Sequence, residues 1–361
     1  MNGAVDGAVI GWDVGGAHLK AARIEGGRAV AALHLPCPLW QGLERLDAAL
    51  AAALARLGPA ARHAATMTGE LADVFADRST GVVHIAGTLA RHVAPAPLLL
   101  WAGRAGFVPA ALAGAHAADI ASANWLATAT LVAATVADGL LADMGSTTTD
   151  LIPLAAGAPC PAGHTDAARL AGGELVYTGL ARSFVLGLAD RVPFAGAWTP
   201  LAGEYFASSA DLHRLLGTLP AAADPLPAAD GRAKTVAASC ARLARMVGRD
   251  AAEAPEAAWR DLAAYLAEAQ LRRIADAAAL VLSRGLVAAG APVIGAGWGR
   301  GVMRRLADRL GRPFRDIATL PPLAALPADD AAQCAPAAAA ALLAGRPETV
   351  GGFANTRLPA A

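Results

Sequence analysis

Two short loops, each following an apolar run and each placing an aspartate before a glycine, constrain the fold of this chain most strongly. The first loop, residues 13–16, reads Asp-Val-Gly-Gly, and the second loop, residues 143–150, reads Asp-Met-Gly-Ser-Thr-Thr-Thr-Asp. Each apolar run is typical of a buried strand. Glycine lets the backbone turn tightly and brings N–H groups close to an anion, while an aspartate there can hold a hydrated divalent cation. The pattern therefore predicts a phosphate site that is built twice.

Within the two loops, the residue types divide into metal-holding and phosphate-binding candidates. Asp13 and Asp143 end their strands and are the candidate Mg²⁺ ligands. Asp150 either shares that role or orients the second loop, and the sequence leaves both open. Backbone N–H groups and hydroxyls make the remaining positions phosphate-binding candidates, namely Gly15, Gly16, Gly145, Ser146, Thr147 and Thr148.

A third strand-then-glycine element lies late in the chain, at residues 293–299, Val-Ile-Gly-Ala-Gly-Trp-Gly. The order of the three loops resembles that of the actin, sugar-kinase and Hsp70 superfamily. That resemblance implies an α/β fold in which two ribonuclease-H-like domains, as in actin-like ATPases, flank a central cleft. It also implies a nucleoside-like or substrate pocket formed by Gly295, Gly297 and Trp298 together with Asn124.

The length of the chain agrees with two domains. Its 361 residues exceed the roughly 250 to 300 at which one core stops growing. We expect an N-terminal lobe over residues 1–138, completed by a C-terminal helix at about 330–361, and a C-terminal lobe over 139–329. Alternation about Gly26-Gly27 predicts a hairpin that continues from the first strand, and the second loop joins another hairpin.

Composition excludes several classes of partner. The formal net charge is zero and the 30 basic residues are scattered, so nothing favours nucleic acid and we expect small-molecule substrates. The four cysteines have no paired spacing, which argues against a zinc knuckle and predicts reduced thiols. No secretory leader pattern is present, so we expect a cytoplasmic protein. The uncharged run 120–137 contains several polar residues and predicts a buried helix rather than a membrane span.

Lys20 is the leading catalytic candidate, because it is one of only two lysines and lies on the second strand of the first hairpin. Its ammonium can point back toward an anion held by the first loop, although a solvated strand lysine is the alternative. Residues 67–78 predict a helix capped by Thr68, with Glu70, Asp73 and Asp77 on one charged solvent face.

Glu174, in the segment 172–179, is the other acidic candidate. This segment reads either as a simple helix start or as a place from which Glu174 reaches the substrate.

Four motifs narrow the resemblance: Met-Thr-Gly-Glu-Leu-Ala-Asp at 67–73, Ala-Asn-Trp at 123–125, Ala-Asp-Met-Gly-Ser-Thr-Thr-Thr-Asp-Leu-Ile-Pro at 142–153 and Gly-Glu-Leu-Val-Tyr-Thr-Gly at 173–179. They resemble the hydantoinase/oxoprolinase relatives, and among these the branch linked to tetrahydromethanopterin one-carbon metabolism and to methanofuran and methylofuran synthesis. The resemblance implies a transferase that joins an aminomethylfuran-methyl diphosphate to the phenol of γ-glutamyltyramine, forming an aryl ether and releasing diphosphate.

The implied chemistry assigns roles to the candidate residues. Mg²⁺ on Asp13 or Asp143, Lys20 and the loop donors would stabilise the leaving diphosphate. A phenol has a pKa near 10, so a carboxylate is expected to accept its proton, with Glu70, Asp73 and Glu174 as alternatives.

Two other functions remain open at this point. The glycine-rich late loop resembles a nucleoside-binding element, so ATP binding is undecided, and an ATP-dependent kinase or amidohydrolase is the first alternative. A non-catalytic, nucleotide-gated switch of the actin type is the second. The sequence does not determine the oligomeric state.

Overall fold

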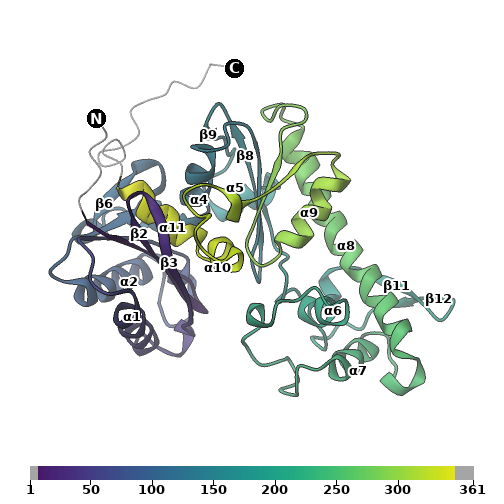
Figure 1. Ribbon diagram of the computed structural model, residues 1–361. Coiled ribbons are helices and arrows are strands. Elements are labelled where there is room, and N and C mark those ends of the chain that lie inside the picture. Colours follow the sequence, from purple (N-terminus) through teal and green to yellow (C-terminus); the bar gives the residue numbers. More distant parts are fainter. Residues whose placement is uncertain (1–6, 346–361) are drawn as a thin grey trace. The chain divides into compact units, whose positions relative to one another are not determined.

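The computed structural model describes residues 7–345 (Figure 1), which fall into two compact units. The first unit takes in the described residues up to 137, the segment 156–159 and the described residues from 317 onward. The second unit takes in residues 138–155 and 160–316. The part of the expected C-terminal helix at 346–361 lies outside the described residues. Each unit has its own sheet and its own hydrophobic core.

The first unit contains a six-stranded sheet in the order β3-β2-β1-β4-β5-β6. Its strands are β1 (Val9–Val14), β2 (His18–Glu25), β3 (Arg28–Pro36), β4 (Arg62–Met67), β5 (Leu98–Trp101) and β6 (Phe107–Pro109), and β9 (Ala158–Pro159) also falls in this unit. Strands β1, β2 and β3 are successively antiparallel, whereas β4 and β5 run parallel to β1. The hairpin predicted about Gly26-Gly27 is therefore confirmed.

The two faces of β1 pack against different helices. The helices of this unit are α1 (Glu44–Leu57), α2 (Arg78–Val93), α3 (Ala117–Ile120), α4 (Asn124–Ala133), α10 (Ala328–Gln333) and α11 (Ala335–Ala344). Because side chains alternate along a strand, Ile10 and Trp12 enter the core shared with α1 and α2. Gly11 faces the alanine-rich α11, where an added Cβ would lie 1.8 Å from the carbonyl oxygen of Ala337. Asp13 shares the Gly11 face of the strand.

The second unit contains a sheet in the order β10-β8-β7-β13-β14. Its strands are β7 (Gly139–Met144), β8 (Thr149–Ala155), β10 (Leu175–Val176), β13 (Val293–Ala296) and β14 (Phe314–Asp316). Strand β7 is antiparallel to β8 and parallel to β13. With β10 antiparallel to β8 and β14 parallel to β13, this sheet repeats the topology of β3-β2-β1-β4-β5. The protein is thus an α/β chain with two ribonuclease-H-like domains, as the order of loops predicted.

The helices of the second unit gather along one long helix, α8 (Glu256–Leu282). Helices α6 (Ser209–Leu215) and α7 (Val236–Met246) contact α8, and α9 (Arg300–Arg309) lies nearer its C-terminal end (Figure 1). Two clusters of buried side chains result, one around β7, α9 and the later part of α8, and one around α6, α7 and the earlier part. The remaining elements of this unit are α5 (Asp166–Ala171) and the hairpin of β11 (Arg191–Phe194) and β12 (Ala197–Pro200).

Two predictions about buried segments are confirmed. The uncharged run 120–137 contains α4, whose residues are almost all buried. Across residues 7–345, no helix has both the length and the apolar character that a membrane span requires. The four cysteines are free thiols, three of them buried.

Candidate functional site

The first loop closes as a tight turn directly after β1. The N–H of Gly15 donates to the carbonyl of His18 at 2.9 Å, and this turn places β2 antiparallel to β1 with Lys20 directly opposite Asp13. The Lys20 Nζ lies 3.1 Å from Asp13 Oδ2. Asn124, at the start of α4, donates from Nδ2 to Asp13 Oδ1 at 3.5 Å. The structure therefore brings Asp13, Lys20 and Asn124 together, with the Asp13 side chain 1% exposed and that of Lys20 23% exposed.

The chain that leaves β4 runs beneath the first loop. The N–H of Thr68 donates to the carbonyl of Val14 at 2.9 Å, and a Cβ on Gly69 would lie 3.1 Å from that same oxygen. The predicted helix capped by Thr68 is wrong: residues 69–71 form a single 3₁₀ turn, and α2 begins only at Arg78. Asp77 caps α2 by accepting the N–H of Thr80 at 2.7 Å.

Glu70 is buried as a consequence of this turn, although the spacing of acidic residues predicted a solvent face. Its side chain is 1% exposed, and Oε1 accepts a hydrogen bond from Ser122 Oγ at 2.8 Å. Its other oxygen, Oε2, is buried and has no hydrogen-bond partner among the described residues. Burial raises the pKa of Glu70, and the bond from Ser122 opposes that rise. Asp73 is exposed to solvent.

The second loop repeats the turn of the first. The N–H of Gly145 donates to the carbonyl of Thr148 at 2.9 Å, the same spacing as Gly15 and His18. Asp143 is half-buried and lies opposite Asp150 in the register of β7 and β8. Asp150 Oδ1 accepts a hydrogen bond from the buried Arg169 at 2.7 Å, which favours the orienting role for Asp150.

The hydroxyls of the second loop are available to a ligand. The side chains of Ser146, Thr147 and Thr148 are partly exposed. None of them makes a side-chain hydrogen bond within residues 7–345. A short turn that presents backbone N–H groups and free hydroxyls is suited to an anion.

Glu174 is held by the fold. Its Oε1 accepts the N–H of Ala162 at 2.6 Å and pairs with Arg284, while Oε2 accepts the N–H of Gly163 at 3.2 Å. The side chain is fully buried. The reading of this segment as a helix start is wrong, because α5 ends at Ala171 and the residues after Glu174 form β10. These contacts favour a structural role for Glu174.

Two glycines of the late loop are explained by close contact with the second loop, and the third by contact with β14. Gly297 has φ +73°, and its Cβ would lie 2.4 Å from Asp143 Oδ1. The N–H of Gly299 donates to the carbonyl of Met144 at 2.9 Å. A Cβ on Gly295 would meet the Phe314 ring at 2.5 Å.

Trp298 is partly buried against the neighbouring hydrophobic core. The late loop thus packs against Asp143 and Met144.

The residues present suit a Mg²⁺ ion that is coordinated mainly by water and by the oxygens of a bound phosphate compound. Among residues 7–345, no group of three or more His, Cys, Asp or Glu side chains is arranged to hold a metal. Mg²⁺ in phosphate sites uses one or two carboxylates, with substrate oxygens and waters completing its shell. Asp13 and Asp143 each lie near the end of a strand, beside a turn suited to phosphate, so either one could supply a single carboxylate ligand.

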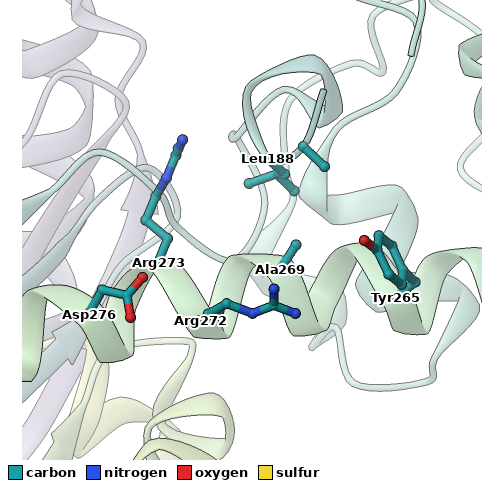
Figure 2. A pocket seen from close by; sticks show the side chains of 7 residues that line it. Leu188, Tyr265, Ala269, Arg272, Arg273 and Asp276 are labelled. Carbon is teal, nitrogen blue, oxygen red and sulfur yellow. The ribbon is translucent and has the colours of Figure 1, made fainter. Parts of the chain in front are cut away.

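A separate shallow pocket of about 310 Å³ lies along α8 (Figure 2). Ala269, Arg272, Arg273 and Asp276 of α8 line it, and Leu188 faces them from a neighbouring turn. Both arginines and the aspartate are exposed. None of the predicted site residues lines this pocket.

Comparison with known proteins identifies the family. The sequence profile of the hydantoinase/oxoprolinase family matches residues 62–332, well over half of the chain. The chain belongs to the hydantoinase/oxoprolinase family. Within this family, a curated relative from Methanocaldococcus jannaschii is 32% identical over 243 residues, covering 67% of this chain and 72% of the relative. A relative from Methanococcus vannielii is 39% identical over 77 residues, covering 21% of this chain and 34% of the relative.

Both relatives bear the same name, (4-{4-[2-(gamma-L-glutamylamino)ethyl]phenoxymethyl}furan-2-yl)methanamine synthase. Among solved structures, a nucleotide-free acetone carboxylase is similar in fold to this hydantoinase/oxoprolinase family member. It has 11% sequence identity and a TM-score of 0.54, covering 84% of this chain and 67% of that one.

Proposed function

We propose that the protein is a transferase that couples an aminomethylfuran-methyl diphosphate to the phenol of γ-glutamyltyramine, in methanofuran or methylofuran synthesis. The observation that carries the proposal is the 32% identity to a synthase whose name describes that ether, a phenoxymethyl link between a γ-glutamylaminoethyl-phenol and a furan methanamine. The two Asp-x-Gly turns supply the anion-binding groups that such a reaction requires.

The reaction breaks one C–O bond and makes another. The bond between the furan-methyl carbon and the diphosphate oxygen breaks, and its electron pair leaves with the diphosphate. The furan ring stabilises the resulting cation, which the phenol oxygen attacks to form the ether, and the phenol gives up its proton. The task of the protein is therefore to stabilise the charge that develops on the leaving group, where preorganised donors are most effective.

Lys20 is the residue we assign to the leaving group. Its ammonium is held beside Asp13 at the first loop and is partly exposed, so it can approach a bound anion without a large rearrangement. The second unit carries its own set of anion-binding donors, the N–H groups and free hydroxyls of Ser146, Thr147 and Thr148. Within each unit a tight turn fixes the backbone of these donors, and such preorganisation is what electrostatic stabilisation of a transition state requires.

Mg²⁺ is part of this proposal, with Asp13 or Asp143 as the residue that holds it. When bound, it would neutralise charge on the diphosphate. Asp13 is already paired with Lys20, and Asp143 begins the second loop with Gly297 packed against its carboxylate.

Glu70 is the base that the geometry favours for the phenol proton. It alone of the three candidates combines burial, a raised pKa and an oxygen without a partner among the described residues. A carboxylate with a raised pKa is better matched to removing a proton near neutral pH. Asp73 is exposed, and Glu174 already accepts hydrogen bonds at both oxygens.

A coupled assay tests the proposal. Purified protein with Mg²⁺, the aminomethylfuran diphosphate and γ-glutamyltyramine, without ATP, should form the ether and diphosphate in equal amounts by mass spectrometry. The product should not form when either substrate is left out. If no ether forms, and a parallel reaction that contains ATP shows ATP turnover, the transferase would be contradicted and a kinase or amidohydrolase of the same fold supported.

A further inference from the structure

The second loop is shaped by one neighbouring segment, residues 178–182. The N–H of Leu180 donates to the carbonyl of Gly145 at 3.0 Å, and the N–H of Arg182 donates to that of Ser146 at 2.8 Å. Gly179 passes so close that an added Cβ would lie 2.5 Å from both Ser146 C and Thr147 N. Any shift of this segment would therefore move the anion-binding turn itself.

A buried side chain of α8 helps to hold that segment in place. Gln270 is fully buried, and its Nε2 donates to Thr178 Oγ1 at 2.9 Å and to the carbonyl of Gly179 at 2.7 Å. Ser209 Oγ also donates to the Gly179 carbonyl, at 2.9 Å. Thr178 is tied to β8 as well, since Thr149 Oγ1 donates to its carbonyl at 2.8 Å. Buried side-chain amides in such networks are effective positioning groups because every unmade bond is costly.

His213 contacts the other end of the Gln270 amide. Its Nε2 lies 3.0 Å from Gln270 Oε1, and its Nδ1 lies 2.9 Å from Thr218 Oγ1. The Gly179 carbonyl can only accept, so the amide nitrogen of Gln270 faces it and Oε1 faces His213, whose Nε2 must then carry the proton. The residues that hold the second loop are thus connected in one line from α6 through α8.

We propose that Gln270 is a positioning residue for the second loop, acting through Thr178 and Gly179 to hold residues 145–148 in the shape that binds diphosphate. That the ligand is a diphosphate rests on the proposed function. That Gln270 holds the shape of the loop does not depend on the proposed function, so the positioning role and the ligand can be tested separately.

Hydrogen–deuterium exchange of the ligand-free protein tests the positioning role directly. Gln270→Leu, of similar volume, should speed exchange about tenfold or more in residues 145–148 and 179–183. Thr178→Val removes the hydroxyl that bonds Gln270 Nε2 and Ser183 Oγ but keeps the bond from Gln270 to the Gly179 carbonyl, so it should speed exchange in the same segments to a smaller extent. Gln333→Leu is the matched control, because Gln333 is a buried glutamine of the first unit. Unchanged exchange in both segments, or faster exchange spread over the whole second unit, would overturn the proposal.

Titration calorimetry with inorganic diphosphate and Mg²⁺ tests whether the position of the loop affects diphosphate binding. Gln270→Leu should weaken binding about tenfold, and it should raise KM for the furan diphosphate while leaving KM for γ-glutamyltyramine unchanged. Faster exchange with no diphosphate binding even in the wild type supports the positioning role and counts against the proposed function. Wild-type affinity in a variant whose loop exchanges faster would overturn the inference.

Discussion

Lys20 Nζ lies 3.1 Å from Asp13 Oδ2, and the two residues are direct partners in the register of β2 and β1. The pairing of β1 with β2 therefore brings the lysine ammonium beside the aspartate that is the candidate metal ligand. The aspartate is almost fully buried, whereas the ammonium keeps some contact with solvent. Under the proposed function, a diphosphate that binds at the first loop would meet a lysine that is already oriented by Asp13.

Replacing Lys20 should impair both catalysis and stability. Lys20→Met should lower turnover about a hundredfold or more, the usual cost of losing one preorganised charge-stabilising group. It should also lower the free energy of unfolding by about 2 kcal/mol, because a buried carboxylate loses its charged partner. Coupled-assay kinetics and urea unfolding measure the two effects.

Lys234→Met is the matched control, since Lys234 is the only other lysine and pairs with Asp224 in the second unit. It should leave turnover near the wild-type rate. Near-normal turnover in Lys20→Met would remove Lys20 from the mechanism.

Glu70→Gln should lower turnover without lowering the stability of the folded protein near neutral pH. The amide keeps the shape of the carboxylate but cannot accept the phenol proton, so turnover should fall at least a hundredfold. Asp73→Asn, at an exposed carboxylate, should leave turnover unchanged. An equal loss of turnover in both variants, or in neither, would contradict the assignment of Glu70 as the base.

The difference in stability between Glu70→Gln and the wild type should depend on pH with a defined sign. Burial raises the pKa of Glu70 in the folded protein, so the folded state binds more protons than the unfolded state above the ordinary glutamate pKa of about 4.3. The wild type should therefore lose stability as pH rises from about 4.3 through the folded-state pKa. Glu70→Gln should be the more stable protein at pH 8, with the advantage gone at pH 3.5, as urea unfolding at both values would show.

Local patterns were enough to predict much of the fold. Apolar runs ended by glycine gave the strands that carry both loops, and alternation about Gly26-Gly27 gave the first hairpin. Lys20 was found because strand register is local: a tight turn between β1 and β2 determines which residue faces Asp13.

The environment of individual side chains was not predictable in the same way. Glu70 has the spacing of a surface carboxylate, and its burial depends on Ser122, which is 52 residues away and has φ +52°. Gln270 sits in an alanine-rich helix, and its partners Thr178 and Gly179 are about 90 positions earlier. Long-range contacts of this kind leave no periodic signal in the sequence.

Acid should destabilise the first unit through His63. Trp12 Nε1 donates to His63 Nδ1 at 3.1 Å, which requires that nitrogen to be unprotonated, and burial lowers the pKa of His63 to about 4. The unfolded state takes up a proton below about pH 6.5 while the folded state does not. The contribution of His63 to the free energy of unfolding should be fully present above pH 6.5 and should fall as pH is lowered, with a loss of about 2 kcal/mol at pH 5.

Urea unfolding at pH 8 and pH 5 measures this loss. His63→Gln should show a smaller difference between the two pH values than the wild type, whereas His84→Gln, at an exposed histidine, should not. An unchanged difference in His63→Gln would show that other groups cause the acid sensitivity.

Gly297→Ala should disrupt the second loop by contact rather than by backbone strain. Gly297 and Gly285 have φ +73° and +72°, so alanine is about equally strained at either position. At Gly285 nothing lies within 4 Å of the added Cβ, whereas at Gly297 it would lie 2.4 Å from Asp143 Oδ1 and from the Met144 carbonyl. Gly285→Ala should therefore lower the melting temperature but keep wild-type affinity for inorganic diphosphate with Mg²⁺. Gly297→Ala should in addition weaken that affinity at least tenfold, and equal affinities in the two variants would mean that the close approach of the late loop does not maintain the binding site.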